Sequence, residues 1–157
     1  MDKNKLLEQR RHIDQSRCHV TLSANEADQI RQSIVQSWRR SDGAKIPLGR
    51  KQAPLNPVSS EQSFYLKKAL AYCQDQLQHI TLQSSMVMAV ADIGSTIIWT
   101  TTSKRMQKAA EDVNFVAGGY WGETQVGTNA LALSLKTQQS TCVFSNEHYM
   151  ASVHDWV

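Results

Sequence analysis

A stripe of apolar residues at helical spacing is the first clear pattern in the chain. It consists of Ala27, Ile30, Ile34 and Trp38. Ser23-Ala24-Asn25-Glu26, just before it, has the form of a capping box, in which the Ser and Glu side chains satisfy N–H groups at a helix start. The spacing predicts an amphipathic helix. Ser41-Asp42-Gly43 ends the pattern, and we expect Gly43 to be the left-handed residue that follows the helix.

A second helical pattern begins after the last proline. Ser59 and Gln62 are spaced as another capping box. Apolar residues then recur at heptad spacing, namely Leu66, Leu70, Cys73, Leu77 and Ile80. This seam lasts only about two heptads, whereas a coiled coil usually shows about three or four. Two interpretations remain open: the helix packs on the sheet of its own domain, or it pairs with its copy in a dimer.

The next stretch has the alternation that is typical of strands. Residues 84–91 are apolar on both faces, as in a strand covered on both sides. Asp92-Ile93-Gly94-Ser95 predicts a turn, and residues 96–102 are β-branched and aromatic. The two runs are therefore predicted to form a hairpin.

The rest of the chain predicts two more helices and a strand. Residues 103–113 are expected to form a short charged helix, and residues 128–136 a second one. Residues 140–144 alternate as in a strand. Residues 146–154 are predicted to form a turn or short helix, and residues 155–157 the start of another strand. Antiparallel strands with helices packed against them define the α+β class, which is the predicted fold class.

The prolines suggest where the chain divides. All three, Pro47, Pro54 and Pro57, lie within residues 44–57, which reads as a linker or a surface loop. Residues 1–57 are therefore predicted as an N-terminal helical arm with a Pro-containing linker, and residues 58–157 as the main domain. A length of 157 residues fits one domain with such an arm.

Composition narrows the class of protein. A hydrophobic content of 41% and a charged content of 20% are typical of a globular protein with a buried core. No apolar run is long enough for a spanning helix, and the polar N-terminus does not resemble a secretory signal. Cys18, Cys73 and Cys142 are far apart with no C-x-x-C pair, so we expect reduced thiols in a cytoplasmic protein.

The net charge of +3 is unevenly distributed. Residues 1–60 carry eleven Lys or Arg and six Asp or Glu, a balance of +5; residues 61–157 carry six and eight, a balance of −2. A basic arm is one way to contact nucleic acid. Its basic residues are, however, interspersed with acidic residues and Gln, and no DNA-reading motif is present. We therefore favour a solvated helical surface.

The residues that most often carry catalysis do not form a recognisable set. Cys142, His148 and His154, with Glu147 beside the middle one, do not have the spacing of a zinc site. Cys142 lies in the predicted strand, where a buried, inert thiol is expected. There is no G-x-S-x-G elbow and no phosphate-binding P-loop. We therefore expect no enzyme activity, no metal and no cofactor; a Cys142–His148 enzyme is the weakest alternative.

Four of the seven glycines fall in residues 118–129, which lead directly into the helix predicted at 128–136. A glycine-rich loop that opens a helix permits close backbone approach to a ligand, or simply a tight turn. Aromatic side chains gather in and beside this part of the chain, as in a small-molecule pocket. Thr128 and Asn129 either fix a ligand or cap the helix. His148 is expected to line the pocket or to fix its loop.

Three segments together resemble one bacterial family. They are Asn114-Phe115-Val116-Ala117-Gly118-Gly119-Tyr120-Trp121-Gly122-Glu123-Thr124-Gln125-Val126-Gly127-Thr128-Asn129-Ala130, Glu147-His148-Tyr149, and Ser37-Trp38-Arg39-Arg40-Ser41 with Gly43. The first is similar to the family pattern PG-x-x-W-x-E-x-x-x-GTN, with Ala117 where proline is usual. The family is the N-terminal GAF sensor domains of sigma-54-dependent transcriptional activators of the acetoin-catabolism type, which include dihydroxyacetone regulators.

This resemblance implies a GAF fold, a central antiparallel sheet flanked by helices, and a cytoplasmic sensor of a small metabolite. The expected ligand-binding residues are Trp99, Phe115, Trp121, Thr128, Asn129 and His148. A homodimer is expected, and DNA and sigma-54 RNA polymerase would be bound only through further domains. The family's last strands would lie beyond Val157, which predicts an incomplete sheet and marginal stability or pairing with a second copy. The alternative is a dimerisation or interaction module without a ligand.

Overall fold

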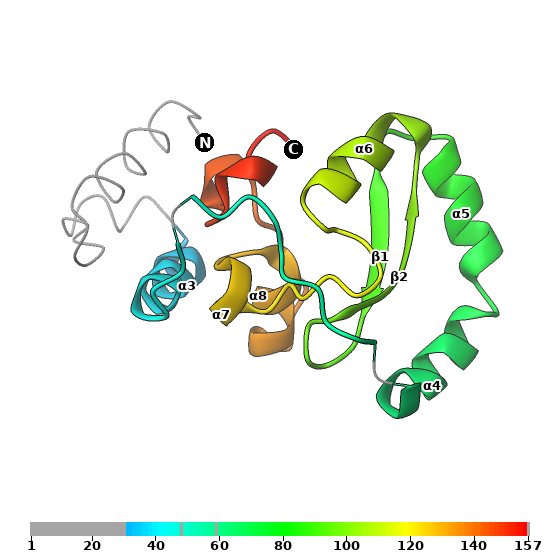
Figure 1. Ribbon diagram of the computed structural model, residues 1–157, viewed down its shortest axis with the longest axis horizontal. Helices are drawn as coiled ribbons and strands as arrows, with labels where there is room; N and C mark the ends of the chain where they lie inside the picture. Colours follow the sequence, from blue (N-terminus) through cyan, green and yellow to red (C-terminus); the bar gives the residue numbers. More distant parts are fainter. Residues whose placement is uncertain (1–30, 48, 59, 157) are drawn as a thin grey trace. The chain divides into compact units, whose positions relative to one another are not determined.

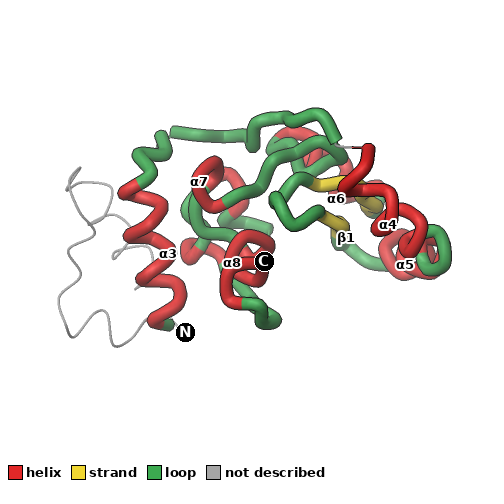
Figure 2. The backbone as a smooth tube through the Cα atoms, turned by 90° about the horizontal axis from the view of Figure 1, so that it is seen from below, coloured by secondary structure: helices red, strands yellow, loops and turns green. Residues whose placement is uncertain are grey.

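The computed structural model describes residues 31–47, 49–58 and 60–156, without the side chains of residues 60–62. The chain divides into two compact units. The described part of unit 1 comprises residues 31–51 and 122–156, and unit 2 comprises residues 52–121. Strands occur only in unit 2 among the described residues, whereas unit 1 is built from helices and loops (Figure 2). The domain boundary predicted at residue 57 stays a prediction.

Unit 2 is organised around an antiparallel hairpin. Strand β1 (Val87–Ala91) pairs with β2 (Ile97–Thr102), with Val87 opposite Thr102 and a register shift between Val90 and Ala91. The turn is held by Asp92, whose carboxylate accepts the N–H groups of Gly94 and Thr96, both at 2.9 Å. The predicted hairpin and its turn are confirmed.

Three helices accompany the hairpin in unit 2. They are α4 (Ser60–Leu70), α5 (Gln74–Leu82) and α6 (Lys104–Asp112). Helices α5 and α6 both contact the two strands and lie on either side of the hairpin (Figure 1). The helix predicted for residues 103–113 is therefore confirmed as α6, and the two strands flanked by helices confirm the α+β class.

The single helix predicted through the heptad seam is wrong. The chain leaves the helix after Leu70, where the N–H groups of Tyr72 and Cys73 bond to carbonyls three residues back, a tighter turn than the α-helix allows. A second helix then starts at Gln74. The seam residues consequently differ in environment: Leu70 is buried, whereas Leu66 and Ile80 are exposed.

Unit 1 begins with α3 (Gln32–Gly43) and continues with α7 (Glu123–Val126) and α8 (Ala130–Thr137). Two short 3-10 helices follow, η1 (Ser145–Glu147) and η2 (Ala151–Val153). The core gathers around α3; its members are Ile34, Val35, Trp38, Ile46, Leu133, Val143 and Tyr149. The predicted helix at 128–136 and the short helical turns at 146–154 are confirmed. Both predicted capping boxes depend on residues outside the described ones.

Two local expectations for unit 1 are wrong. The left-handed residue after α3 is Lys45 with φ +54°, not Gly43, because the helix continues through Gly43 and Ala44 is still right-handed. Residues 140–144 form no strand, since the described part of unit 1 offers no strand for pairing. Their alternation still places Val143 in the core. The Cys142 thiol, expected to be buried, is exposed on the other side.

No helix in the described ranges is long and apolar enough to cross a membrane.

Candidate functional site

The first half of the glycine stretch lies beside the hairpin of unit 2. The N–H of Ile97 donates to the Gly119 carbonyl at 2.9 Å, and the N–H of Gly118 donates to the Ile97 carbonyl at 2.8 Å. On its other side, the N–H of Asn56 donates to the Gly118 carbonyl at 2.7 Å. A Cβ on Gly119 would lie 2.1 Å from the Asn114 carbonyl oxygen, so no side chain fits there. The stretch is therefore held by backbone bonds on two sides.

Trp121 ends this half of the loop as a buried anchor. Its side chain is 3% exposed, its indole N–H donates to the Asn114 carbonyl at 3.0 Å, and its ring packs edge-on against Phe115 with centroids 4.9 Å apart. A buried indole normally has such a partner. Trp99, on β2, is half-buried. Unit 2 thus contains three of the six expected ligand-binding residues, two of which touch.

The second half of the stretch belongs to unit 1 and starts α8. Gly127 has φ +78°, and a Cβ there would lie 2.3 Å from the Cβ of Tyr149. The Asn129 side chain accepts the N–H of Ala132 at 2.9 Å and donates to the Gly127 carbonyl at 2.8 Å. Of the two roles left open for Asn129, the structure therefore shows the helix cap. Gly127 is required by the close approach of Tyr149.

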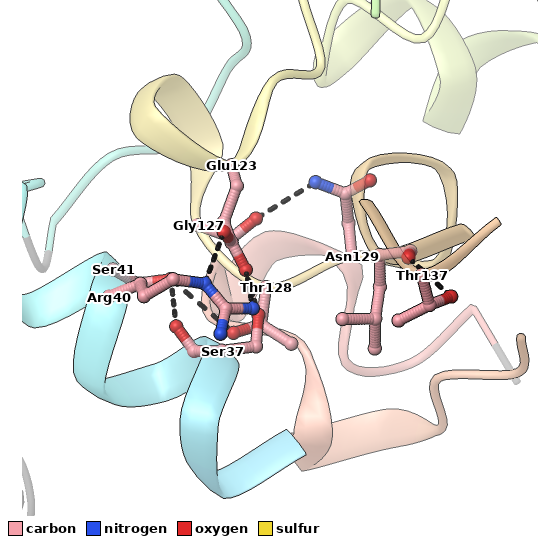
Figure 3. Close-up of polar contacts among 9 residues, drawn as sticks. Ser37, Arg40, Ser41, Glu123, Gly127, Thr128, Asn129 and Thr137 are labelled. Atoms are coloured by element: carbon pink, nitrogen blue, oxygen red, sulfur yellow. Dashed lines mark hydrogen bonds and ion pairs between the residues drawn. The ribbon is translucent and has the colours of Figure 1, made fainter. Parts of the chain in front are cut away.

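Glu123 connects this loop to α3. Its carboxylate accepts two hydrogen bonds from the Arg40 guanidinium, both at 2.7 Å, and a short one from the Ser37 hydroxyl (Figure 3). One turn further along α3, the Ser41 and Thr128 hydroxyls lie 3.4 Å apart. Burial acts to raise the pKa of Glu123, but the hydrogen bonds from Arg40 and Ser37 and the Arg40 charge outweigh it and lower that pKa. The carboxylate thus stays ionised and ties α7 to α3.

Glu147 connects a second loop to the same helix. Its side chain is fully buried, and its carboxylate accepts hydrogen bonds from Arg31 and, at 2.8 Å, from the N–H of Phe144. The Trp38 indole N–H donates to the Glu147 carbonyl at 2.8 Å. Arg31 also lies over the Phe144 ring, 5.5 Å from its centroid. The carboxylate is buried but ionically paired, as such groups require.

The parts of the three family-like segments that belong to unit 1 therefore form one cluster. The residues of the first segment up to Trp121 belong to unit 2. Sequence reasoning treated Ser37, Arg40, Glu123 and Glu147 as marks of resemblance and missed the contacts of Glu123 with Ser37 and Arg40 and of Glu147 with Arg31; it did not single out Arg31 at all. One signal was available: Arg40 and Ser37 lie on a helix with an apolar stripe, and a lone carboxylate follows the Trp121-Gly122 pair. Charges in such positions usually need a partner.

The six expected ligand-binding residues divide evenly between the units. Trp99, Phe115 and Trp121 belong to unit 2, and Thr128, Asn129 and His148 to unit 1. Thr128 and Asn129 are almost fully buried and His148 is half-buried. The His148 carbonyl lies 3.0 Å from a ring nitrogen of His154. No cluster of three His, Cys, Asp or Glu side chains suited to a metal ion occurs among the described residues.

Comparison with known proteins places these features in a family context. No protein-family model matches the chain. It is 29% identical over 134 residues to the acetoin dehydrogenase operon transcriptional activator AcoR of Bacillus subtilis, covering 81% of this chain and 22% of AcoR. It is 19% identical over 134 residues to the propane 2-monooxygenase operon transcriptional activator MimR of Mycolicibacterium smegmatis, covering 85% of this chain and 23% of MimR. The chain thus spans about a fifth of the length of these relatives.

A solved structure has the same fold. The N-terminal region of E. coli DhaR, solved in complex with DhaL, aligns with a TM-score of 0.68 over 80% of this chain and 44% of that one, at 15% identity. This likeness confirms the GAF-like α+β fold. Together with the relatives, it confirms the resemblance seen in the three segments: the chain is similar to the N-terminal sensor domains of sigma-54-dependent transcriptional activators of the acetoin-catabolism type.

Proposed function

We propose that this chain is the sensor region of a bacterial sigma-54-dependent activator, which binds a small metabolite in the cytoplasm and catalyses no reaction itself. Contacts with DNA and with sigma-54 RNA polymerase are assigned to parts of such activators that lie outside the span matched here. AcoR and MimR are both transcriptional activators by name, which supports a regulatory role.

One observation carries the proposal: a single helix, α3, holds both loops that contain the family-like motifs of unit 1. It binds the loop at Glu123 through Ser37 and Arg40, and the loop at Glu147 through Trp38, while Arg31, the residue just before the helix, also binds Glu147. Loops fixed in this way are pre-organised, which lowers the entropic cost of binding a ligand. A change in either loop is also transmitted directly to α3, as a regulatory domain requires.

The six residues remain the proposed ligand contacts, and each unit is tested separately. In unit 2, Trp99 is half-buried and suits an apolar contact, whereas Trp121 is bonded within the protein and supports Phe115. In unit 1, Thr128 and Asn129 position the backbone and His148 is the more accessible of the three. Trp99→Leu and His148→Gln are therefore the informative variants, because neither removes a fully buried anchor.

The test is thermal stabilisation of the full chain by a panel of small metabolites, with acetoin included because AcoR is named for an acetoin dehydrogenase operon. A ligand that binds only the folded state stabilises it by mass action and so raises Tm. At a ligand concentration a hundredfold above Kd, the free energy of unfolding increases by about 2.7 kcal/mol. We expect a concentration-dependent rise that Trp99→Leu or His148→Gln reduces. A panel that leaves Tm unchanged at every concentration would contradict the sensor proposal.

A second function has its own supporting observation. Large apolar side chains are exposed along α4, α5 and the turn between them; they include Phe64, Tyr65, Tyr72, Ile80 and Leu82. Exposed apolar patches are typical of protein interaction surfaces. We propose homodimerisation through this surface, either beside ligand sensing or, in the alternative, as the sole function of the chain.

A further inference from the structure

Strand β1 forms an open edge of the hairpin in unit 2. On the other side, β2 continues into paired backbone, since Ile97 bonds to Gly118 and Gly119, and residues 118–120 bond in turn to residues 54–56. No strand or isolated bridge pairs with the far side of β1 among the described residues. One edge of the hairpin is therefore covered by backbone hydrogen bonds, and the other is not.

The backbone groups on this open edge belong to Val87 and Ala89. The Met86 carbonyl accepts the N–H of Ser103, so the backbone groups of Met86 point toward β2. The direction alternates along an antiparallel strand, so the N–H and C=O groups of Val87 and Ala89 point away from β2. These groups form no further backbone hydrogen bond within the described part of the chain. Such a row of unpaired groups is a template for another strand.

The open edge also lacks the features that keep exposed edges from pairing. Natural edge strands are blunted by charged residues, by proline, by bulges or by being very short. Residues 84–91 contain no charged residue and no proline. Strand β1 has an ordinary length of five residues, and its register shift lies between Val90 and Ala91, beyond the two outward-facing positions. The edge is therefore suited to pairing rather than to solvent.

We propose that β1 pairs antiparallel with β1 of a second copy, with Met88 opposite Met88 of that copy, so that the two hairpins form one continuous sheet. In this register Val87 of each copy lies opposite Ala89 of the other, and the outward N–H and C=O groups of both residues are paired. The pairing is isologous and uses the open β1 edge of each copy, so it closes at two copies. The inference rests on the homodimerisation proposed above and adds the strand that makes the contact.

Two features favour a second copy as the partner. Like charges directly opposite each other destabilise a strand pair, and an uncharged strand meets none in its own copy. A two-fold axis perpendicular to the sheet also places α5 and its copy on the same face of that sheet, because α5 lies on one side of the hairpin (Figure 1). Ile80 and Leu82 of α5 and Met86, just before β1, are exposed. The strand contact therefore continues into the apolar surface already assigned to self-association.

The first test measures amide hydrogen exchange in the wild-type full chain over a range of protein concentrations. We expect exchange at Val87 and Ala89 to be fast in dilute protein and to slow about tenfold when nine-tenths of the chain is paired, by mass action. Met88, which faces β2, is the internal control and should be protected at every concentration. Fast exchange of Val87 and Ala89 at every concentration means that the edge stays open, and slow exchange at every concentration means that one chain covers its own edge. Either result overturns the proposal.

The second test is disulfide cross-linking of Met88→Cys in a background with Cys18, Cys73 and Cys142 replaced by Ser. Facing residues of a non-hydrogen-bonded antiparallel pair have Cα atoms about 4.5 Å apart, within the range of a disulfide. We therefore expect a covalent dimer under mild oxidation. The matched control is Val90→Cys, on the same face of β1 and also half-buried. Its two copies would be about 14 Å apart along the strands, too far to cross-link. Equal cross-linking of the two variants, or none in either, contradicts the proposed pairing.

The tests separate strand pairing from the proposals on which it builds. If light scattering shows a dimer while Val87 and Ala89 exchange at one rate at every concentration, association through α4 and α5 stands and strand pairing fails. If Met88→Cys cross-links while replacement of Tyr65 and Tyr72 by Ser leaves the molar mass unchanged, strand pairing stands and the α4–α5 contact fails. Ligand sensing is measured independently, by the rise of Tm with a metabolite.

Discussion

At the scale of single residues, Gly127 is a position where the backbone conformation and the packing both require glycine. Its φ of +78° is unfavourable for any residue with a Cβ, and a Cβ would lie 2.3 Å from the Cβ of Tyr149. We predict that Gly127→Ala lowers the free energy of unfolding by about 2–4 kcal/mol, since strain and overpacking both contribute. Urea unfolding measures the loss.

Gly43 is the matched control for this prediction. It lies at the end of α3 without a positive φ, and nothing lies within 4 Å of an added Cβ. Gly43→Ala should leave stability unchanged or raise it by up to about 1 kcal/mol. Equal effects of the two substitutions would show that the conformation of Gly127 is not the reason for its presence.

Glu123 gives a prediction about pH. Its folded-state pKa lies below the ordinary value of 4.5, so ionisation stabilises the fold above that value and the contribution is lost as pH falls through the lowered pKa. We expect Glu123→Gln to lower the free energy of unfolding by about 1–3 kcal/mol at pH 7, because the charged bonds to Arg40 and Ser37 are weakened. The difference from wild type should shrink as pH falls from 5 toward about 3.

The exposed pair Lys108–Asp112 is the control for the pH series. Its ammonium and carboxylate are 3.1 Å apart, but both side chains are largely exposed. Asp112→Asn should change stability by no more than about 0.5 kcal/mol at any pH in the range. A Glu123→Gln effect that is independent of pH would mean that the carboxylate charge does not hold α7 to α3.

At the scale of elements, α3 is the helix on which both loops of unit 1 depend, and Trp38 is its centre. The side chain is fully buried, and its indole N–H donates to the Glu147 carbonyl. Trp38→Phe keeps most of the apolar volume and leaves that carbonyl without this donor. We predict a loss of about 1–3 kcal/mol from the lost bond together with a small cavity term.

The same variant has a local consequence that unfolding experiments do not show. Amide hydrogen exchange should accelerate at Phe144, Glu147 and His148, which lie in the loop that Trp38 holds, more than in the hairpin of unit 2. Exchange that accelerates uniformly through the chain would contradict a specific link between α3 and this loop. Trp121→Phe is the matched tryptophan control in unit 2, because its indole N–H bonds to the Asn114 carbonyl instead.

Elements with local causes were predictable from the sequence, whereas the candidate site was not. The hairpin follows from an apolar run before Asp92 and a β-branched run after it, and the α8 cap from Asn129 just before an apolar run. The bonds that build the cluster join residues far apart: Ser37 and Glu123 are 86 positions apart, and Trp38 and Glu147 are 109 apart. Spacing rules report neighbours within a few residues, so they cannot pair such groups.

Two wrong element predictions have the same origin. Burial does alternate along residues 142–144, as the sequence pattern predicts. A strand also requires a partner strand, however, and the sequence does not show which elements share a unit. The heptad pattern through Leu66 and Ile80 was interrupted by a turn at Tyr72 and Cys73 that contains neither Gly nor Pro. Tertiary packing decides such cases, because local propensities are weak.

At the scale of the whole molecule, the exposed apolar side chains of α4, α5 and their connecting turn predict self-association. Tyr65 is 79% exposed and Tyr72 83% exposed, in a region that also exposes Phe64 and Leu82. Burying such apolar surface against a second copy stabilises the dimer by about 25 cal/mol for each Å² removed from water. We expect the molar mass measured by light scattering to rise with protein concentration.

Replacing Tyr65 and Tyr72 together by Ser should shift the chain toward the monomer while the chain stays folded, because neither side chain is buried within the chain. Ile93→Ser is the matched control: Ile93 is 87% exposed but lies in the hairpin turn, away from α4 and α5 in sequence, so its replacement should leave the association unchanged. If the double variant keeps its metabolite-induced rise in Tm, sensing does not require the dimer. If the wild-type chain is monomeric at every concentration, the α4–α5 surface is not an interface between copies, and sensing alone remains.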